Sequence, residues 1–378
     1  MELSSTHIRC SVGIDLCALE RNLGRLKNLL SVSQKYIALV SADAFGFGVE
    51  AAAVRLMLSG ADGFAVTNLS EGERVRGIGE GWPVIVMSSS LPGEEEFYFR
   101  NDLRPTLVSC EETERFMQCA RRLKTSLKVH IRVPKNDEYS LPTSQEALKM
   151  LDMLIAPDSP LELEALCIAG MGSGAPEEGV TPNFQFLKTV DGILRAKNKK
   201  IFVHHSDTFN PATLPAYFES SFRAGLVLFG ISPKEGSILG NFRPEPVMTF
   251  KGAVSQVKDL PKGATVGYGK TYTLSRDSKI ALLSIGYGDG LRRNAGKKGV
   301  VLINGRSFPI IGIVSMDQAS VDVTDMPDIQ VGDEAILIGS SGEESITIEQ
   351  YCNSLEISPA EALTSITKRV PRYYKTVY

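Results

Sequence analysis

Short apolar runs alternate with longer amphipathic runs between residue 35 and about residue 230. The apolar runs have the length and composition of buried strands, and the runs between them repeat apolar residues at helical spacing. The predicted strands are residues 36–41, 63–68, 83–89, 104–109, 127–133, 161–170, 201–206 and 222–230, and the predicted helices include residues 49–60, 70–79, 110–123, 144–155 and 183–197. This α/β alternation favours parallel pairing, and eight strands can close into a (β/α)8 barrel of the TIM type. An open doubly wound sheet is the alternative, because strand order cannot be read from the pattern.

The pattern changes after residue 240. Segments such as 248–260, 299–316 and 334–339 are rich in β-branched residues and are separated by turn signals such as PKG and NG. They predict a mostly antiparallel C-terminal β domain, with a short helix near residues 358–366. We therefore divide the chain into a barrel, residues 1–240, and a β domain, residues 241–378.

Composition narrows the classes of partner. The 378 residues are 43% hydrophobic and carry a formal net charge of −3, with lysines and arginines scattered along the chain, so neither a nucleic-acid nor a membrane partner is expected. The six cysteines and four histidines lack metal-binding spacing, and His204 and His205 are interpreted as packed side chains. No signal peptide or membrane-spanning stretch is recognisable, so we expect a cytoplasmic protein without a metal.

The segment "VSADAFGFG", residues 40–48, connects the first predicted strand to the helix that follows it. Corners of this kind carry catalytic groups in α/β enzymes. This corner has a serine, two phenylalanines and no strong base or nucleophile. Its chemistry is therefore the main question that the sequence raises.

Several segments together resemble the alanine racemase family. They are "VGIDLCALERNL" (12–23), "ALVSADAFGFG" (38–48), "FRAGLVLFGISP" (222–233), "LPKGATVGYGKTYT" (260–273), "IGYGDG" (285–290), "PIIGIVSMDQASVDVT" (309–324) and "RVPR" (369–372). The resemblance spans nearly the whole chain. It implies a barrel followed by a β domain, a homodimer, and pyridoxal phosphate (PLP) as the cofactor.

The family motif at the corner has the form K-A-N/D-A-Y-G-H-G, and its lysine forms a Schiff base with PLP and acts as one of two bases. The matching residue here is Ser41. A serine hydroxyl cannot form an imine, and no histidine or lysine adjoins it in the segment to activate it. Phe45 replaces the family's usual tyrosine and Phe47 its usual histidine, so two further polar groups are absent.

Other family positions are retained. The resemblance places Tyr268 at the second base, which acts on the partner subunit's cofactor, and Arg223 opposite the pyridine nitrogen of PLP. Gly225 and Leu226 match a backbone cradle for the phosphate, and Thr208 matches a serine hydroxyl that also holds it. The substrate-entrance and partner-subunit positions correspond to Tyr287, Met316 and Asp317, and a phosphate contact is expected near Lys368.

Several family positions are altered in the middle of the barrel. Asp207 replaces an asparagine near the phosphate, where a carboxylate is repulsive. The family's K-x-D-T-G-M-x-R turn reads "RVPKNDEY", with Arg132 at the lysine and Tyr139 near the arginine. A histidine that stacks on the PLP ring is replaced by Ala169. These losses favour a natural relaxation of the PLP chemistry.

Three functions follow from the resemblance. The first is a homologue without racemase activity that binds PLP, a PLP adduct of an amino acid, or another phosphorylated ligand non-covalently. The second is an active PLP-dependent racemase in which Lys270 or Lys368 replaces the missing lysine. The third is an inactive subunit that pairs with a genuine racemase and contributes Tyr268 to it.

Overall fold

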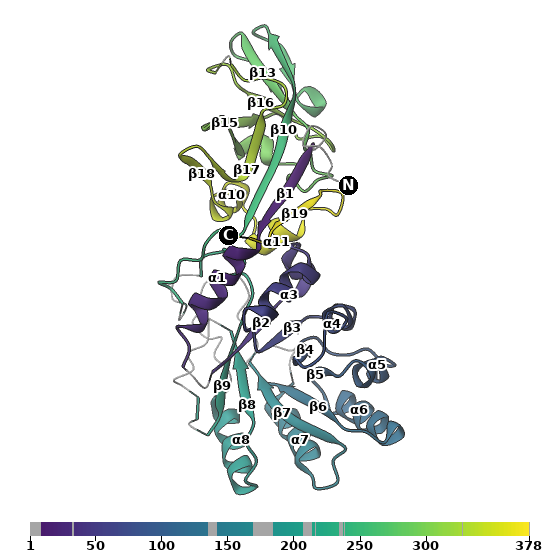
Figure 1. Cartoon of the computed structure of the whole chain (residues 1–378). Coiled ribbons are helices and arrows are strands. Elements are labelled where there is room, and N and C mark those ends of the chain that lie inside the picture. Colours follow the sequence, from purple (N-terminus) through teal and green to yellow (C-terminus); the bar gives the residue numbers. More distant parts are fainter. Residues whose placement is uncertain are drawn as a thin grey trace.

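The computed structural model describes residues 9–31, 34–134, 142–168, 184–206, 214–215, 217–233, 237, 239–326 and 328–377. Two domains lie end to end, a barrel surrounded by helices at one end and a sheet-rich domain at the other (Figure 1). Within the described ranges, no helix is long and apolar enough to cross a membrane. The two-domain organisation agrees with the order of α/β and β patterns along the sequence.

Eight parallel strands close the barrel in sequence order, because β9 pairs with β2. The predicted (β/α)8 barrel is confirmed, and the open-sheet alternative is wrong. The strands are β2 (Lys35–Leu39), β3 (Gly63–Val66), β4 (Val84–Val86), β5 (Leu103–Leu107), β6 (Leu127–Arg132), β7 (Leu161–Cys167), β8 (Phe202–His205) and β9 (Glu219–Ala224). The helices of this domain are α1 (Leu16–Lys27), α2 (Ser41–Phe45), α3 (Val49–Leu58), α4 (Leu69–Arg76), α5 (Glu95–Arg100), α6 (Cys110–Leu123), α7 (Ser144–Ile155) and α8 (Phe184–Ala196).

The barrel interior has an apolar half and a polar half. On β2, β3 and β4, alternate residues Ile37, Ala65 and Ile85 form a cluster separate from the main core, which lies between the strands and the helices. Strands β5, β6, β8 and β9 contribute buried polar side chains instead. These are Thr106, His130, Arg132, His204 and Arg223. The half-polar interior is unusual for a packed barrel and marks the side on which a polar ligand is expected.

A mixed, mostly antiparallel sheet forms the second domain, as predicted. Its nine strands have the order β18-β17-β14-β15-β16-β13-β10-β1-β19. They are β1 (Cys10–Asp15), β10 (Met248–Leu260), β13 (Ser278–Leu283), β14 (Val300–Ile303), β15 (Arg306–Ile311), β16 (Ala319–Asp322), β17 (Glu334–Ser341), β18 (Glu344–Ile346) and β19 (Arg372–Lys375). A separate hairpin, β11 (Thr265–Val266) and β12 (Tyr272–Thr273), and helices α9 (Ala295–Lys298), α10 (Ile348–Leu355) and α11 (Pro359–Thr364) complete the domain.

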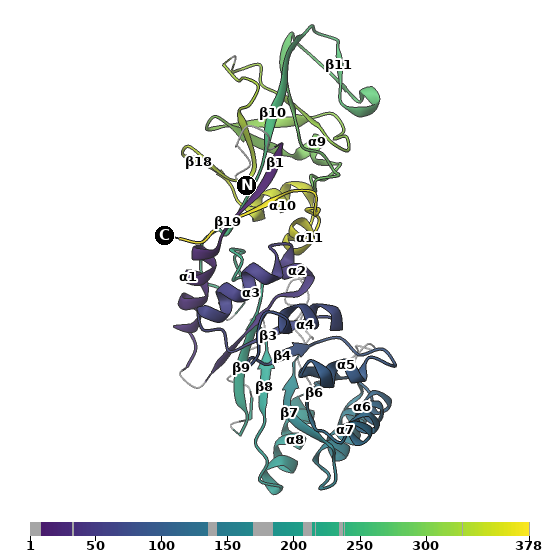
Figure 2. The ribbon, with the colours of Figure 1, turned by 45° about the vertical axis from the view of Figure 1, so that its right-hand side comes forward.

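The first strand of the chain lies in the second domain. β1 pairs antiparallel with β10 and parallel with β19, although the sequence division at residue 240 assigns it to the barrel. The chain then enters α1, which contacts α3 on the barrel. The domains are thus joined by two crossings of the chain, one before α1 and one before β10, as Figure 2 shows.

Arg372 in β19 adds a direct tie between the domains. Its Nε donates to the carbonyl oxygen of Gly46 at 3.3 Å, immediately after α2. Its Nη1 donates to the carbonyls of Thr367 and Val370 at 2.6 and 2.7 Å, and its Nη2 to that of Ile366 at 2.8 Å. One guanidinium therefore fixes the segment before β19 against the end of α2.

Replacing Arg372 with methionine is expected to lower the free energy of unfolding by about 2–3 kcal/mol, because buried carbonyls lose a charged donor. Urea unfolding followed by circular dichroism measures this loss. Arg276→Met is the matched control, since Arg276 makes only an exposed ion pair with Asp325. If both variants shift the urea midpoint equally, the interdomain role of Arg372 is refuted.

Candidate functional site

The chain makes a left-handed turn directly after β2. Ala42, Asp43 and Ala44 have φ values of 52°, 59° and 53° with ψ values of 51°, 44° and 51°, and Phe45 has φ 56°. This conformation costs about 1–2 kcal/mol for each residue other than glycine. A run of such residues is retained only where the surrounding structure enforces it, and strain of this kind concentrates at functional sites.

Two carboxylates hold this turn in place. The Asp43 carboxylate accepts the backbone N–H of Val49 at 3.1 Å and Nη2 of Arg74 at 2.7 Å. The Glu71 carboxylate accepts the backbone N–H of Ala42. The Glu71 contact satisfies the backbone N–H of Ala42 in the turn, and the Asp43 contacts tie the turn to the start of α3 and to Arg74 of α4.

Ser41 lies at the start of the turn and is almost fully buried, with 7% of its surface exposed. Its Oγ has no hydrogen-bond partner. A buried hydroxyl without a partner costs roughly 1–3 kcal/mol and requires an explanation, such as a ligand. No base contacts this hydroxyl, so nothing in the described structure activates it as a nucleophile.

Phe45 packs directly on Gly225, the residue after β9. A Cβ at Gly225 would lie 2.7 Å from Cε2 of Phe45 and 2.9 Å from the carbonyl oxygen of Leu39. Only glycine therefore fits at this position. The Phe45 ring also packs edge-on against Phe229 at 5.6 Å, and Phe47 packs against the same ring at 4.7 Å. The two phenylalanines of the corner thus form an aromatic cluster next to the predicted phosphate cradle of Gly225 and Leu226.

Phe47 also lines a pocket of about 220 Å³ between the domains. Phe229, Pro246, Ile346 and Leu363 are among its other lining residues. Most of the residues that line the pocket are apolar. The family's usual histidine is therefore replaced by a residue that completes an apolar contact between the domains.

Arg223 and Arg132 lie inside the barrel without a carboxylate partner among the described residues. Nη2 of Arg223 donates to the carbonyl of Ile168 at 2.9 Å, and its Nη1 contacts Nδ1 of His204. Both arginines reach Sγ of Cys167, Arg132 at 3.4 Å and Arg223 at 3.6 Å. Burial, together with the nearby Arg132 charge, lowers the pKa of Arg223. This end of the barrel therefore carries positive charge that favours an anionic ligand.

Tyr268 lies far from this corner within one chain. It is 67% exposed and belongs to the short helix η3 (Tyr268–Lys270) between β11 and β12. Figure 2 shows that hairpin at the end of the second domain opposite the barrel. Lys270 is on the same turn and is also exposed. Within one chain, neither Tyr268 nor Lys270 therefore lies near Ser41.

Two of three other predicted residues are held by an arginine. Tyr287, Met316 and Asp317 are exposed. Arg369 donates from Nη2 to the carbonyl of Met316 at 3.2 Å and to Oδ1 of Asp317 at 2.8 Å, and from Nε to Oδ1 of Asp289 at 2.8 Å. The sequence motif contains Arg369, but its role in fixing this loop becomes visible only in the structure.

Lys368 is exposed and precedes Arg369. The segment that carries it is fixed on both sides, because Thr367 Oγ1 donates to the carbonyl of Gly288 at 2.7 Å and Arg372 contacts Gly46. Helix α11, just before this segment, contacts α2. Lys368 therefore lies on a segment that adjoins the corner, unlike Lys270.

Some predicted residues lie outside the described residues. They are Thr208, Asp207, Tyr139 and Ala169. Within the described part of the chain, no group of three or more histidine, cysteine, aspartate and glutamate residues could hold a metal ion. His204 and His205 are both fully buried on β8.

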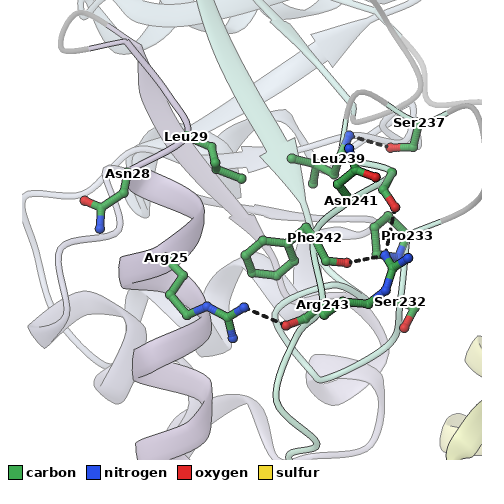
Figure 3. Close-up of a pocket in the computed structure, with 11 residues that line it drawn as sticks. Arg25, Asn28, Leu29, Ser232, Pro233, Ser237, Leu239, Asn241, Phe242 and Arg243 are labelled. Carbon is green, nitrogen blue, oxygen red and sulfur yellow. Dashed lines mark hydrogen bonds between the residues drawn. The ribbon is translucent and has the colours of Figure 1, made fainter.

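A larger pocket, of about 1290 Å³, contains none of the predicted site residues. It lies between the end of α1 and the segment before β10 (Figure 3). Arg25 donates to the carbonyl of Arg243 at 2.8 Å and lies 4.9 Å from the centre of the Phe242 ring. Arg243 donates in turn to the carbonyl of Gly240 at 2.8 Å. The cations of this pocket are thus engaged in holding its own walls together.

Most of this chain matches a known protein family. It matches the N-terminal domain of alanine racemase over residues 14–233 and the C-terminal domain over residues 247–374. The chain belongs to the alanine racemase family. An alanine racemase of Halothermothrix orenii is 31% identical over 364 residues, with 96% of each chain covered. One of Carboxydothermus hydrogenoformans is 32% identical over 365 residues, covering 96% of this chain and 98% of the relative.

Solved structures of alanine racemases have the same fold. The enzyme of Bartonella henselae with covalently bound pyridoxal phosphate has a TM-score of 0.83 at 25% identity, covering 97% of this chain and 99% of that chain. The enzyme of Clostridium difficile in complex with cycloserine has a TM-score of 0.80 at 27% identity, covering 97% and 96%. The family uses pyridoxal phosphate, whereas residues 40–48 of this chain contain no lysine.

The buried histidines predict an acid-sensitive fold. Burial, aided by the charge of Arg223, lowers the pKa of His205 to about 4, and burial also lowers the pKa of His130 and His204. The unfolded chain takes up these protons below pH 6.5, whereas the folded chain does not, so the free energy of unfolding falls as the pH decreases toward 4. For His205 alone the loss is on the order of 3 kcal/mol.

Urea unfolding at pH 7, 6 and 5 measures this slope. Despite its burial, the pKa of Glu164 is held at about 2, mainly by a hydrogen bond to His130, so its stabilisation is lost only below about pH 4.5 and stays outside this window. His205→Asn keeps hydrogen-bonding groups in the place of those that contact Ser206 and Ser220 and is expected to flatten the slope. An unchanged slope in the variant would contradict the role of His205.

Proposed function

We propose that this chain is a dimeric member of the alanine racemase family that binds PLP, or a PLP adduct of an amino acid, without a covalent bond and does not racemise alanine. The observation that carries the proposal is Ser41, at the position where the family has its Schiff-base lysine. The buried hydroxyl has no partner and no base beside it. Removing one positioned base costs roughly 10²–10⁴ in rate, before the loss of the covalent anchor is counted.

The residues that remain fit the charged and polar parts of PLP. Gly225 leaves room that no side chain could share, and Leu226 follows it, so their backbone amides suit a phosphate. Nε of Arg223 makes no hydrogen bond in the described structure and is available to a ring nitrogen or an anion. When bound, PLP supplies an electron sink for bonds at the α-carbon of an amino acid. Phe45 offers the ligand apolar contact in place of a hydroxyl.

A second copy of the chain would complete the site. Tyr268, Tyr287 and Met316 are large, exposed side chains on the second domain, and Asp317 adjoins them. All four lie on the second domain, and Tyr268 lies at the end of that domain away from the barrel of the same chain, so it can act only on the barrel of another. The distribution of exposed aromatic residues therefore supports a homodimer in which each site has residues of both chains.

An active racemase that uses another lysine is the second candidate. Lys368 supports it better than Lys270, because the Lys368 segment adjoins the corner through Arg372 and Gly46. Lys270 could act only from a second chain. A third candidate is an inactive subunit that pairs with a relative that retains the lysine, to which it would contribute Tyr268.

Borohydride reduction of the protein in the presence of PLP separates these functions. We expect an absorbance change on titration with PLP that is lost when the reduced protein is washed, because no lysine carries the cofactor. PLP fixed to a peptide that contains Lys368, and absent from Lys368→Gln, would establish the second function. Lys262→Gln, an exposed lysine on a loop, is the control for non-specific reduction.

Restoring the lysine tests how much of the site has been lost. Ser41→Lys is expected to fix PLP covalently on reduction, yet to racemise alanine at least about 100-fold more slowly than a family enzyme, because Phe45, Tyr139 and Ala169 also differ. Circular dichroism of alanine over time measures the racemisation. Ser41→Arg is the control, since it adds charge and length without an imine-forming amine. A rate equal to that of a family enzyme would show that Ser41 is the only functional difference.

A further inference from the structure

A chain of hydrogen-bonded side chains crosses the barrel from Arg223 to Glu164. Nη1 of Arg223 contacts Nδ1 of His204, and Nε2 of His204 lies 3.0 Å from Nδ1 of His130. Nε2 of His130 lies 3.2 Å from Oε2 of Glu164 on β7. Both histidines are fully buried. The four side chains therefore form one continuous path through the polar half of the barrel.

The two ends of this path fix the direction of every hydrogen bond in it. A guanidinium can only donate and an ionised carboxylate can only accept. Nδ1 of His204 must then accept, its Nε2 carries the proton and donates to His130, and Nε2 of His130 donates to Glu164. Burial lowers the pKa of His204 and His130, which agrees with two neutral rings. Only one combination of His204 and His130 tautomers therefore satisfies every hydrogen bond in the path.

Glu164 is kept ionised by the groups around it. Lys128 Nζ lies 3.1 Å from its Oε1, and Arg104 Nε lies 3.5 Å from its Oε2. A neutral carboxyl group could donate to His130, and the path would then contain two donors that face each other, because Arg223 can only donate; these cations therefore preserve the direction. The base of the barrel thus has a function in orienting a group at its other end.

We propose that Glu164 and His130 are positioning residues that hold Arg223 as an oriented donor toward the ligand. The path and the contacts of Nη1 with Cys167 and of Nη2 with Ile168 engage both terminal nitrogens, which leaves Nε and the second N–H of Nη2 for the ligand. The ligand atom opposite Arg223 must then be an acceptor, such as an unprotonated ring nitrogen or an anion. This inference depends on the proposed function only for the identity of the ligand, PLP. The hydrogen-bonded path itself is present without a ligand.

The tautomers can be observed directly. The chain has four histidines, so selective ¹⁵N-histidine labelling gives few signals in long-range ¹H–¹⁵N spectra of the full-length protein. We expect His204 and His130 to be neutral with the proton on Nε2 at pH 7. A proton on Nδ1 of His204 would overturn the proposal whether or not PLP binds, so failure of the relay and failure of the proposed function are distinguishable.

Binding tests the consequence for Arg223. Glu164→Gln is expected to weaken PLP binding by about tenfold, the size of one charge-assisted hydrogen bond. It should leave the affinity for the analogue with C–H in place of the ring nitrogen within about twofold. Glu162→Gln is the matched control, because Glu162 is exposed on the same strand. An equal loss for both ligands, or no loss for PLP, would refute the positioning role.

Discussion

The geometry of the site depends on the left-handed turn of α2. The left-handed conformation is energetically unfavourable, and hydrogen bonds of Asp43 and Glu71 stabilise it. Because the turn has a fixed direction, Phe45 lies on Gly225 and the carbonyl of Gly46 meets Arg372. The corner of the barrel, the predicted phosphate cradle at Gly225 and the contact between the domains are therefore coupled through one strained segment.

The charges inside the barrel are arranged around this corner. Among the described residues, Arg223 and Arg132 have no carboxylate partner, whereas Glu164 is surrounded by donors. The positive charge of these two arginines favours an anionic ligand. Such an arrangement suits a phosphorylated cofactor held without a covalent bond, which is the state that we propose for a site with Ser41 in place of the lysine.

The periodic features of the fold could be predicted from the sequence. Buried parallel strands are nearly continuous apolar runs, so the eight barrel strands were recognisable, as was the mostly antiparallel second domain. The position of β1 was not predictable, because its pairing with β10 and β19 depends on contacts between distant segments. The left-handed turn had no sufficient local signal either, since Ala42 and Ala44 are not residues that usually adopt this conformation, although aspartate does so more often. The turn is stabilised by Glu71 and Arg74, which both lie on helix α4.

The site was predicted only as far as family resemblance and local motifs extend. Arg223 and Gly225 lie where a ligand could meet them, whereas the path through His204, His130 and Glu164 depends on which residues of three strands face each other. Exchange of the α-hydrogen of L-alanine in D₂O, followed by ¹H NMR with PLP and the protein, tests the central claim most directly. The account predicts exchange no faster than with PLP alone. Exchange well above that background would show that a base of this protein removes the α-proton and would contradict the account.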